Sequence, residues 1–174
     1  MKKINILFYF IFSLFILIFL FPKENIYYLL EEKLLSKNII IDEKKINENL
    51  NSLEIKDGIL YFQNNKIFSF SNILFETNIF KNRLSIKNLK MENIFKNYLK
   101  DEIKEINFEN NFFNHKEING FIYIDKKYDF LITIENDLVN ILFFDKNILN
   151  SSIKKILKNT KTTEKGIVYE LKYN

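Results

Sequence analysis

The sequence predicts a mainly β protein, a curved antiparallel sheet built as a meander and preceded by one N-terminal transmembrane helix. Two observations support this fold class. An apolar run, Ile4–Phe21, opens the chain, whereas the residues after Asn38 alternate between apolar and polar with the period of a strand. An amphipathic helix directly after the run and a short C-terminal helix complete the prediction.

The apolar run has 18 residues, carries no charge between Lys3 and Lys23, and ends at Pro22. A helix over it spans roughly 27 Å at about 1.5 Å per residue, close to the ~30 Å hydrocarbon core of a bilayer. We therefore expect an uncleaved anchor over residues 1–22. A cleaved signal peptide and a buried soluble helix are the alternatives, but the chain has no Ala and no small residues where cleavage would follow the run.

Lys2 and Lys3 precede the run, and the tail that contains them is too short to fold. Lys23, Lys33 and Lys37 follow the run, so the lysines alone do not decide the orientation, but the short tail favours a cytoplasmic N-terminus and an exported domain. In a bacterial cell the prediction is a single-pass inner-membrane protein with a periplasmic domain. Residues 1–22 are the anchor, 23–37 a juxtamembrane amphipathic helix, and 38–174 the β domain.

Residues 23–37 have apolar side chains at helical spacing, at positions 26, 29, 30 and 34, with Tyr27 beside them. A helix so close to a membrane exit can lie at the level of the lipid headgroups, with its tyrosines in the interface. It can equally cap the end of the following sheet without touching lipid. The sequence leaves both possibilities open.

The first strands are predicted from short alternating segments and turn residues. Asp57-Gly58 indicates a tight hairpin after residues 53–56, and Asn64-Asn65 indicates a second turn. Residues 71–80 and 82–91 are expected to form a further hairpin. Its inward cross-strand pairs are expected to be Ile73 and Phe75 against Leu84 and Ile86.

The second half of the chain continues the meander. Residues 92–102 suit either helical turns or a strand with a loop, and 105–108, 118–125 and 128–135 alternate as strands. Residues 138–144 are apolar on both faces, which is typical of a covered central strand or of a strand that lines an apolar groove. Residues 147–158 return to helical spacing, and 166–172 are expected to form the closing strand.

No catalytic arrangement is visible in the sequence, so we expect a protein that is not an enzyme. His115, the single histidine, lies in a polar turn, and the chain has no cysteine, so neither a cofactor nor a metal site is expected. The formal net charge is +4, but the basic residues are interspersed with acids and include one arginine. This pattern excludes the concentrated basic face of a nucleic-acid binder.

Two features can support binding. The 19 phenylalanines and the two-sided apolar segment can line a lipid-holding groove, with Leu138, Leu142 and Phe144 as the lipid-facing residues, although ordinary core packing accounts for most of them. Lys154, Lys155 and Lys158 share one side of the predicted C-terminal helix. They can face anionic headgroups or simply lie in solvent.

The order of these features resembles the membrane-anchored AsmA-like proteins, and within them the protein N-like component of type II secretion systems. The similar segments are the end of the anchor at Phe21-Pro22, the helix 24–35, the segment 53–62, the segment 82–86 and the closing segment 164–169. The strand that contains Gly120 and the predicted helix over 147–158 belong to the same pattern. At the level of architecture, the single-anchor lipopolysaccharide export component with a periplasmic jelly-roll is also similar.

The resemblance implies a non-enzymatic, membrane-anchored periplasmic protein that serves envelope transport or the assembly of a secretion apparatus. A scaffold or accessory protein with an envelope protein partner is the expected function. A transport element that binds lipid or lipopolysaccharide in an apolar β groove is the alternative. Free strand edges, which can accept a further strand, favour the scaffold.

Overall fold

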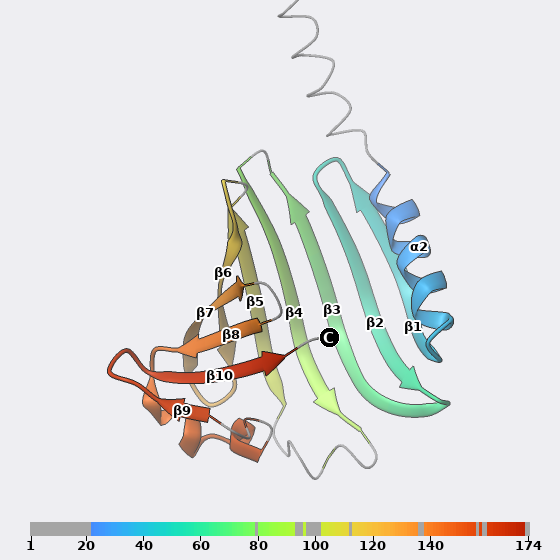
Figure 1. The fold of residues 1–174 in the computed structure, drawn as a ribbon. Helices are drawn as coiled ribbons and strands as arrows, with labels where there is room; N and C mark the ends of the chain where they lie inside the picture. Colours follow the sequence, from blue (N-terminus) through green and yellow to red (C-terminus); the bar gives the residue numbers. More distant parts are fainter. Residues whose placement is uncertain are drawn as a thin grey trace, which may run out of the picture.

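The structure, a computed structural model, describes residues 22–78, 80–92, 96, 102–111, 113–135, 138–155, 157 and 160–172. They form one α-helix, one ten-stranded antiparallel sheet and two short 3-10 helices (Figure 1). The elements are α2 (Lys23–Leu35), β1 (Ile39–Asn49), β2 (Ser52–Phe62), β3 (Asn65–Thr77), β4 (Lys81–Met91), β5 (Ile103–Asn111), β6 (Asn114–Tyr123), β7 (Lys127–Glu135), β8 (Leu138–Phe143), η2 (Lys146–Asn150), η3 (Ser152–Lys155), β9 (Thr160–Thr162) and β10 (Ile167–Lys172).

One part of the predicted fold class is contradicted. Among the described residues, no helix is long and apolar enough to cross a membrane. The described α-helix, α2, has 13 residues, about 20 Å at ~1.5 Å per residue, and carries charged side chains. This finding contradicts the transmembrane helix, the single-pass membrane assignment and the inner-membrane localisation. The predicted anchor itself, Ile4–Phe21, lies outside the described residues.

The sheet is a meander over its first eight strands, each paired antiparallel with the next, as the alternation predicts. At the end of the meander β10 pairs with β8, and the three-residue strand β9 pairs with β10. The sheet is strongly curved: in Figure 1 the long strands β1–β4 run nearly vertically, whereas β8 and β10 run nearly horizontally. The helix α2 lies beside β1 at the other end of the sheet.

Apolar residues form continuous cross-strand rows on the inner face of the sheet. One row begins on β2 and ends on β10, because each member is the register partner of the next. Its members are Leu53, Phe75, Leu84, Phe108, Gly120, Phe130, Phe143 and Ile167. A parallel row contains Ile46, Ile55, Ile73, Ile86, Ile106, Ile122 and Tyr128. These rows supply much of the hydrophobic core.

The pairing is interrupted at one level across the first five strands. Register partners are skipped at Lys44, Asp57, Ser71 and Asn88, on β1 to β4 in turn, and at Lys104 on β5. The numbering of the inward-facing residues changes at the interruption. On β3, for example, odd-numbered residues face inward on one side (Ile73 and Phe75) and even-numbered residues on the other (Phe68 and Phe70). One unpaired residue per strand therefore bends the sheet while keeping apolar side chains inside on both sides of the bend.

The interruption corrects the predicted hairpin at Asp57-Gly58. Strand β2 continues through both residues, and Asp57 adopts a left-handed φ of 51° within the strand. The residues Asp57-Gly58 correctly predicted a left-handed backbone conformation, but the chain reversal predicted from them was wrong. The reversal instead occurs at Gln63 and Asn64, with φ values of 48° and 63°, as expected for the central residues of a type I′ hairpin.

The predicted helix over 147–158 is replaced by η2 and η3. Asp145 caps η2 by accepting a hydrogen bond from the Asn147 amide at 2.8 Å. Ser151 ends it with extended backbone, and its hydroxyl donates to the Ile148 carbonyl at 2.7 Å, which competes with continued helical pairing. Ile148 and Ile153 are buried, so the two short helices close the core at this end of the sheet. Most of residues 92–102 lie outside the described residues.

Candidate functional site

An apolar groove of about 390 Å³ lies between α2 and the inner face of β1–β4. This volume lies within the ~300–1,000 Å³ that is typical of small-molecule sites. The lining side chains are apolar except for one lysine. They are Lys23, Ile26, Tyr27 and Leu30 from α2, and Ile41, Leu53, Ile55, Ile73, Phe75, Leu84 and Ile86 from the sheet.

The groove is open because α2 covers only one end of the inner face. Leu53 is 5% exposed beneath the helix, whereas Phe75, its neighbour in the same row, is 36% exposed. On the helix side, Ile26 and Leu30 line the groove and are also exposed. Large apolar side chains on both walls therefore remain accessible, which indicates a ligand site more than a finished core.

The start of α2 is fixed to the end of β1 by polar contacts. The N-cap residue, Pro22, has no side-chain oxygen, so the Glu48 carboxylate accepts from the backbone N–H groups of Lys23 at 2.8 Å and Glu24 at 3.4 Å. A carboxylate at this position also stabilises the positive end of the helix dipole. The Lys23 Nζ donates to the Leu50 carbonyl at 2.8 Å, which holds the lysine stem along the groove.

Tyr27 connects the middle of α2 to β1. Its ring is buried, and its hydroxyl lies 3.1 Å from a carboxylate oxygen of Glu31 on the helix and 3.1 Å from one of Glu43 on the strand. Burial, and then the two neighbouring carboxylates, raise the pKa of Tyr27 far above its usual range. Burial and the Glu43 charge raise the pKa of Glu31, against the hydrogen bond from Tyr27.

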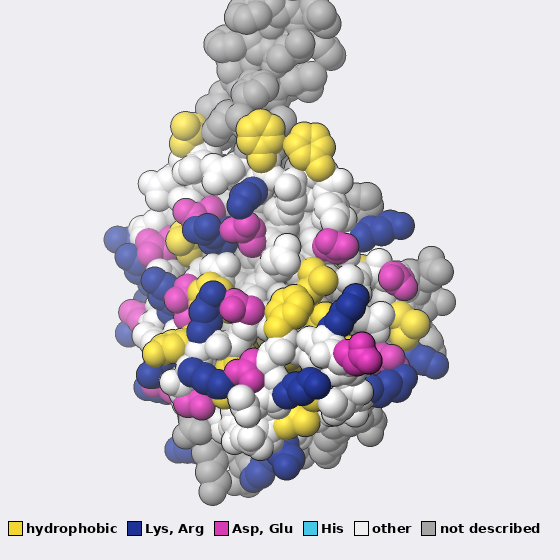
Figure 2. Space-filling model, turned by 90° about the vertical axis from the view of Figure 1, so that its left-hand side faces the viewer, with side chains coloured by type: hydrophobic (Ala, Val, Ile, Leu, Met, Phe, Trp, Pro, Cys, Tyr) yellow, Lys and Arg dark blue, Asp and Glu magenta, His cyan; other side chains and the backbone are white. Residues whose placement is uncertain are grey.

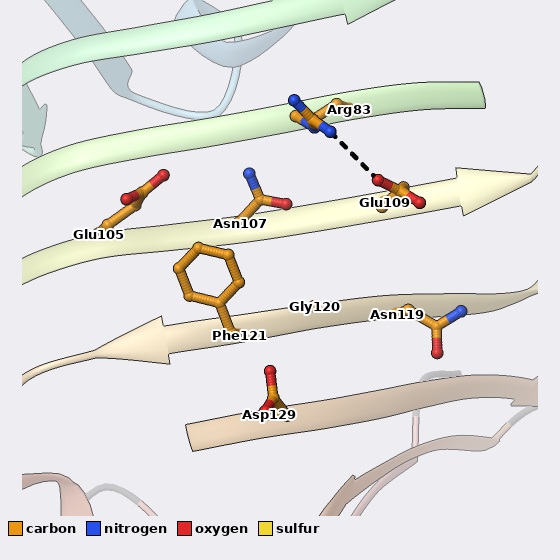
Figure 3. A pocket seen from close by; sticks show the side chains of 8 residues that line it. All are labelled: Arg83, Glu105, Asn107, Glu109, Asn119, Gly120, Phe121 and Asp129. Atoms are coloured by element: carbon orange, nitrogen blue, oxygen red, sulfur yellow. Dashed lines mark hydrogen bonds and ion pairs between the residues drawn. The ribbon is translucent and has the colours of Figure 1, made fainter. Parts of the chain in front are cut away.

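A second hollow, on the outer face of β4–β7, is polar (Figure 3). Two of the four charged residues that line it, Arg83 and Glu109, contact each other at 3.4 Å. The Lys81 ammonium lies 2.7 Å from the other oxygen of Glu109. The hydrogen bond from Lys81 is the largest cause that lowers the pKa of Glu109, and Arg83 adds to it. Acidic and basic side chains are also interspersed over the surface drawn in Figure 2, as on a solvated face.

The described residues contain no group of three or more His, Cys, Asp or Glu side chains placed to hold a metal ion. The side chain of His115 lies outside what the structure describes. The polar hollow contains Glu105, Glu109 and Asp129, but Lys81 and Lys127 pair with two of them at 2.7 Å. The hydrogen bond from Lys81 holds the pKa of Glu109 below its usual range, which does not suit an acid or base that must exchange a proton near neutral pH.

The predicted lipid-facing residues do not line the groove. Leu138 and Leu142 are on β8, and Phe144 follows it directly. Side chains alternate along a strand, and Phe143 is buried on the inner face, so these three lie on the outer face. Phe144 is exposed there. Their contact with lipid remains a prediction, at a surface separate from the groove.

The predicted headgroup-facing lysines are only partly placed. Lys154 and Lys155 are exposed on η3, where they follow the buried Ile153. Lys158 lies outside the described residues. Neither Lys154 nor Lys155 lines the groove, and contact of the three lysines with headgroups also remains a prediction.

The expected inward pairs are confirmed: Ile73 faces Ile86 and Phe75 faces Leu84. The alternation therefore identified four groove residues, but only as core. The missing information was the position of α2, which determines which inward residues are covered.

Comparison with protein-family models, with curated proteins and with solved structures finds no match to this chain.

Proposed function

We propose that this chain is a non-enzymatic binding protein that holds the hydrocarbon part of a lipid in the groove between α2 and β1–β4. The observation that supports the proposal most directly is the groove itself, with its apolar lining and its volume of about 390 Å³. An alkyl chain gains roughly 0.8 kcal/mol for each methylene buried there. No polar lining side chain except Lys23 would lose hydration on binding.

The sheet edges do not add support for the scaffold expectation. Strand augmentation needs a long unpaired edge. At one end of the sheet α2 lies beside β1, and at the other the edge strand β9 has three residues. Binding of a protein partner remains a prediction from the sequence, whereas the groove favours an apolar ligand.

The experiment is lipid retention by the full-length chain. Lipids that remain bound after purification are identified by mass spectrometry, and uptake of the uncharged fluorescent probe N-phenyl-1-naphthylamine is titrated. We expect Phe75→Asp to abolish both, because it places a charge at the open side of the groove, where the residue is 36% exposed. Circular dichroism checks that the variant is folded.

Leu142→Asp is the matched control. It places the same charge on a strand, but on the outer face, at a position predicted from the sequence to face lipid. Retention by Leu142→Asp together with loss in Phe75→Asp supports the groove. Loss in Leu142→Asp alone would transfer the site to the outer face. A wild-type chain that neither retains lipid nor takes up the probe contradicts the proposal.

A further inference from the structure

Tyr27 lies within hydrogen-bond distance of two carboxylates, Glu31 and Glu43. If both carboxylates are ionised, the cluster has only the one hydroxyl proton for these two contacts. The hydroxyl oxygen of Tyr27 lies 3.1 Å from both carboxylates. A tyrosine hydroxyl has one proton and donates to one acceptor at a time, and an ionised carboxylate only accepts. Both contacts are hydrogen bonds only if one carboxyl is protonated and donates to the hydroxyl oxygen.

The surroundings of this cluster supply no compensating cation. In the part of the chain that the structure describes, neither Glu31 nor Glu43 forms an ion pair with Lys or Arg. Glu48 accepts from the amides of Lys23 and Glu24, the Lys23 ammonium donates to the Leu50 carbonyl, and Glu24 accepts from Tyr28. The remaining charged residues of the two elements have exposed side chains: Glu32 and Lys33 on α2, and Asp42, Lys44 and Lys45 on β1. From β2, the residues that line the groove beside them are the uncharged Leu53 and Ile55.

We propose that Tyr27, Glu31 and Glu43 form a proton-dependent latch that closes α2 over the apolar groove. When one carboxyl is protonated, Tyr27 bonds at the same time to Glu31 on its own helix and to Glu43 on β1, and the bond to Glu43 joins the middle of α2 to the strand. When both are ionised, Glu31 competes with Glu43 for the single Tyr27 proton, which weakens the bond from α2 to β1, and two like charges face each other across a partly buried interface. The helix is then released, and with it the wall formed by Ile26, Tyr27 and Leu30.

The direction of the pH effect on the latch follows from the pKa of Glu31. Burial and Glu43 raise the pKa of Glu31, so the folded chain holds the proton more tightly than the unfolded chain does. The stabilisation is complete below the ordinary glutamate pKa of about 4.3 and is lost as the pH rises through the raised value. This inference rests on the proposed function for its ligand: acidic conditions retain the lipid, and a rise in pH favours its exchange.

The test is the pH dependence of binding to the full-length chain, with the same uncharged probe. We expect binding to weaken by about fivefold or more between about pH 4.5 and pH 8. Glu31→Gln should bind tightly over the whole range, because the amide donates to the Tyr27 oxygen without titrating. Glu24→Gln is the matched control, because Glu24 accepts from Tyr28 at 2.9 Å with no second carboxylate, and it should keep the wild-type pH dependence.

Hydrogen exchange of the α2 amides is the second measurement. The ratio of rates between wild type and Glu31→Gln cancels the intrinsic effect of pH on exchange, so a ratio that rises with pH reports release of the helix. Identical behaviour of the two proteins in both measurements overturns the latch. A rising exchange ratio without probe binding at any pH supports the latch and contradicts the proposed lipid function.

Discussion

Phe75 and Phe130 lie in the same cross-strand row of one sheet, yet they have different environments. Phe75 is 36% exposed at the groove, whereas Phe130 is 5% exposed. Phe130 packs between Phe108 and Phe143, with ring centroids 5.6 Å and 5.8 Å away, and it lies against Gly120. The difference comes from what covers the row: β7–β10 and the short helices enclose one end, whereas among the described residues α2 alone covers the other. Similar apolar residues thus form a core at one end and line an open groove at the other.

The largest expected effect tests this comparison directly. Phe130→Ala should lower the free energy of unfolding by about 3–5 kcal/mol, because it leaves a cavity among packed rings. Phe75→Ala should cost about 1 kcal/mol, because solvent already reaches the ring. Urea denaturation measures both. Equal losses would mean that the groove end is packed as tightly as the core.

Gly120→Ala tests the packing at the enclosed end of the row by adding volume, whereas Phe130→Ala removes it. A Cβ at this position would lie 2.3 Å from the Asn107 carbonyl oxygen and 2.6 Å from Cζ of Phe130. Gly120→Ala should therefore cost about 3 kcal/mol by overpacking, measured by the same denaturation. Asn119→Ala, next to it on the outer face, should change stability by about 0.5 kcal/mol or less. A tolerated alanine at 120 would show that this end of the row can expand.

Substitutions at Asn88 test the bend of the sheet at the line of interrupted pairing. It has a φ of 53° on the line of interrupted pairing, and its amide donates to the Ser71 hydroxyl at 3.0 Å. Asn88→Val should cost about 1–2 kcal/mol more than Asn88→Gly, because both lose that hydrogen bond but only valine is strained at positive φ. Thermal unfolding of the two variants makes the comparison. Equal stabilities would mean that the sheet can relax at this position.

The smallest effect is expected on the outer face, where charges replace apolar packing. Lys81 and then Arg83 lower the pKa of Glu109, so its stabilisation is present above the ordinary carboxyl pKa and is lost as the pH falls through the lowered value. Glu109→Gln should cost up to about 1 kcal/mol near pH 7 and almost nothing near pH 2. Denaturation at the two pH values measures the difference, and a cost independent of pH would exclude the ion pairs as its cause.

The sequence predicted local features well where neighbouring strands determine them. The pairs Ile73–Ile86 and Phe75–Leu84, the helix after Pro22 and the apolar strand after residue 137 are all present. Asp57-Gly58 was wrongly interpreted as a chain reversal, because a left-handed residue is also compatible with an interruption inside a strand. The C-terminal helix was wrong because the hydroxyl of Ser151 bonds to the carbonyl of Ile148.

The sequence alone determined the period of each element, the inward residues of the hairpin β3–β4 and the lack of concentrated basic charge. These properties depend on residues close in the chain or on composition. Only the tertiary structure decided which inward residues are covered, because burial depends on the curvature of ten strands and on the position of α2. For the same reason the sequence did not predict the apolar groove at Phe75 and Ile86, which is separate from the apolar strand at residues 138–143.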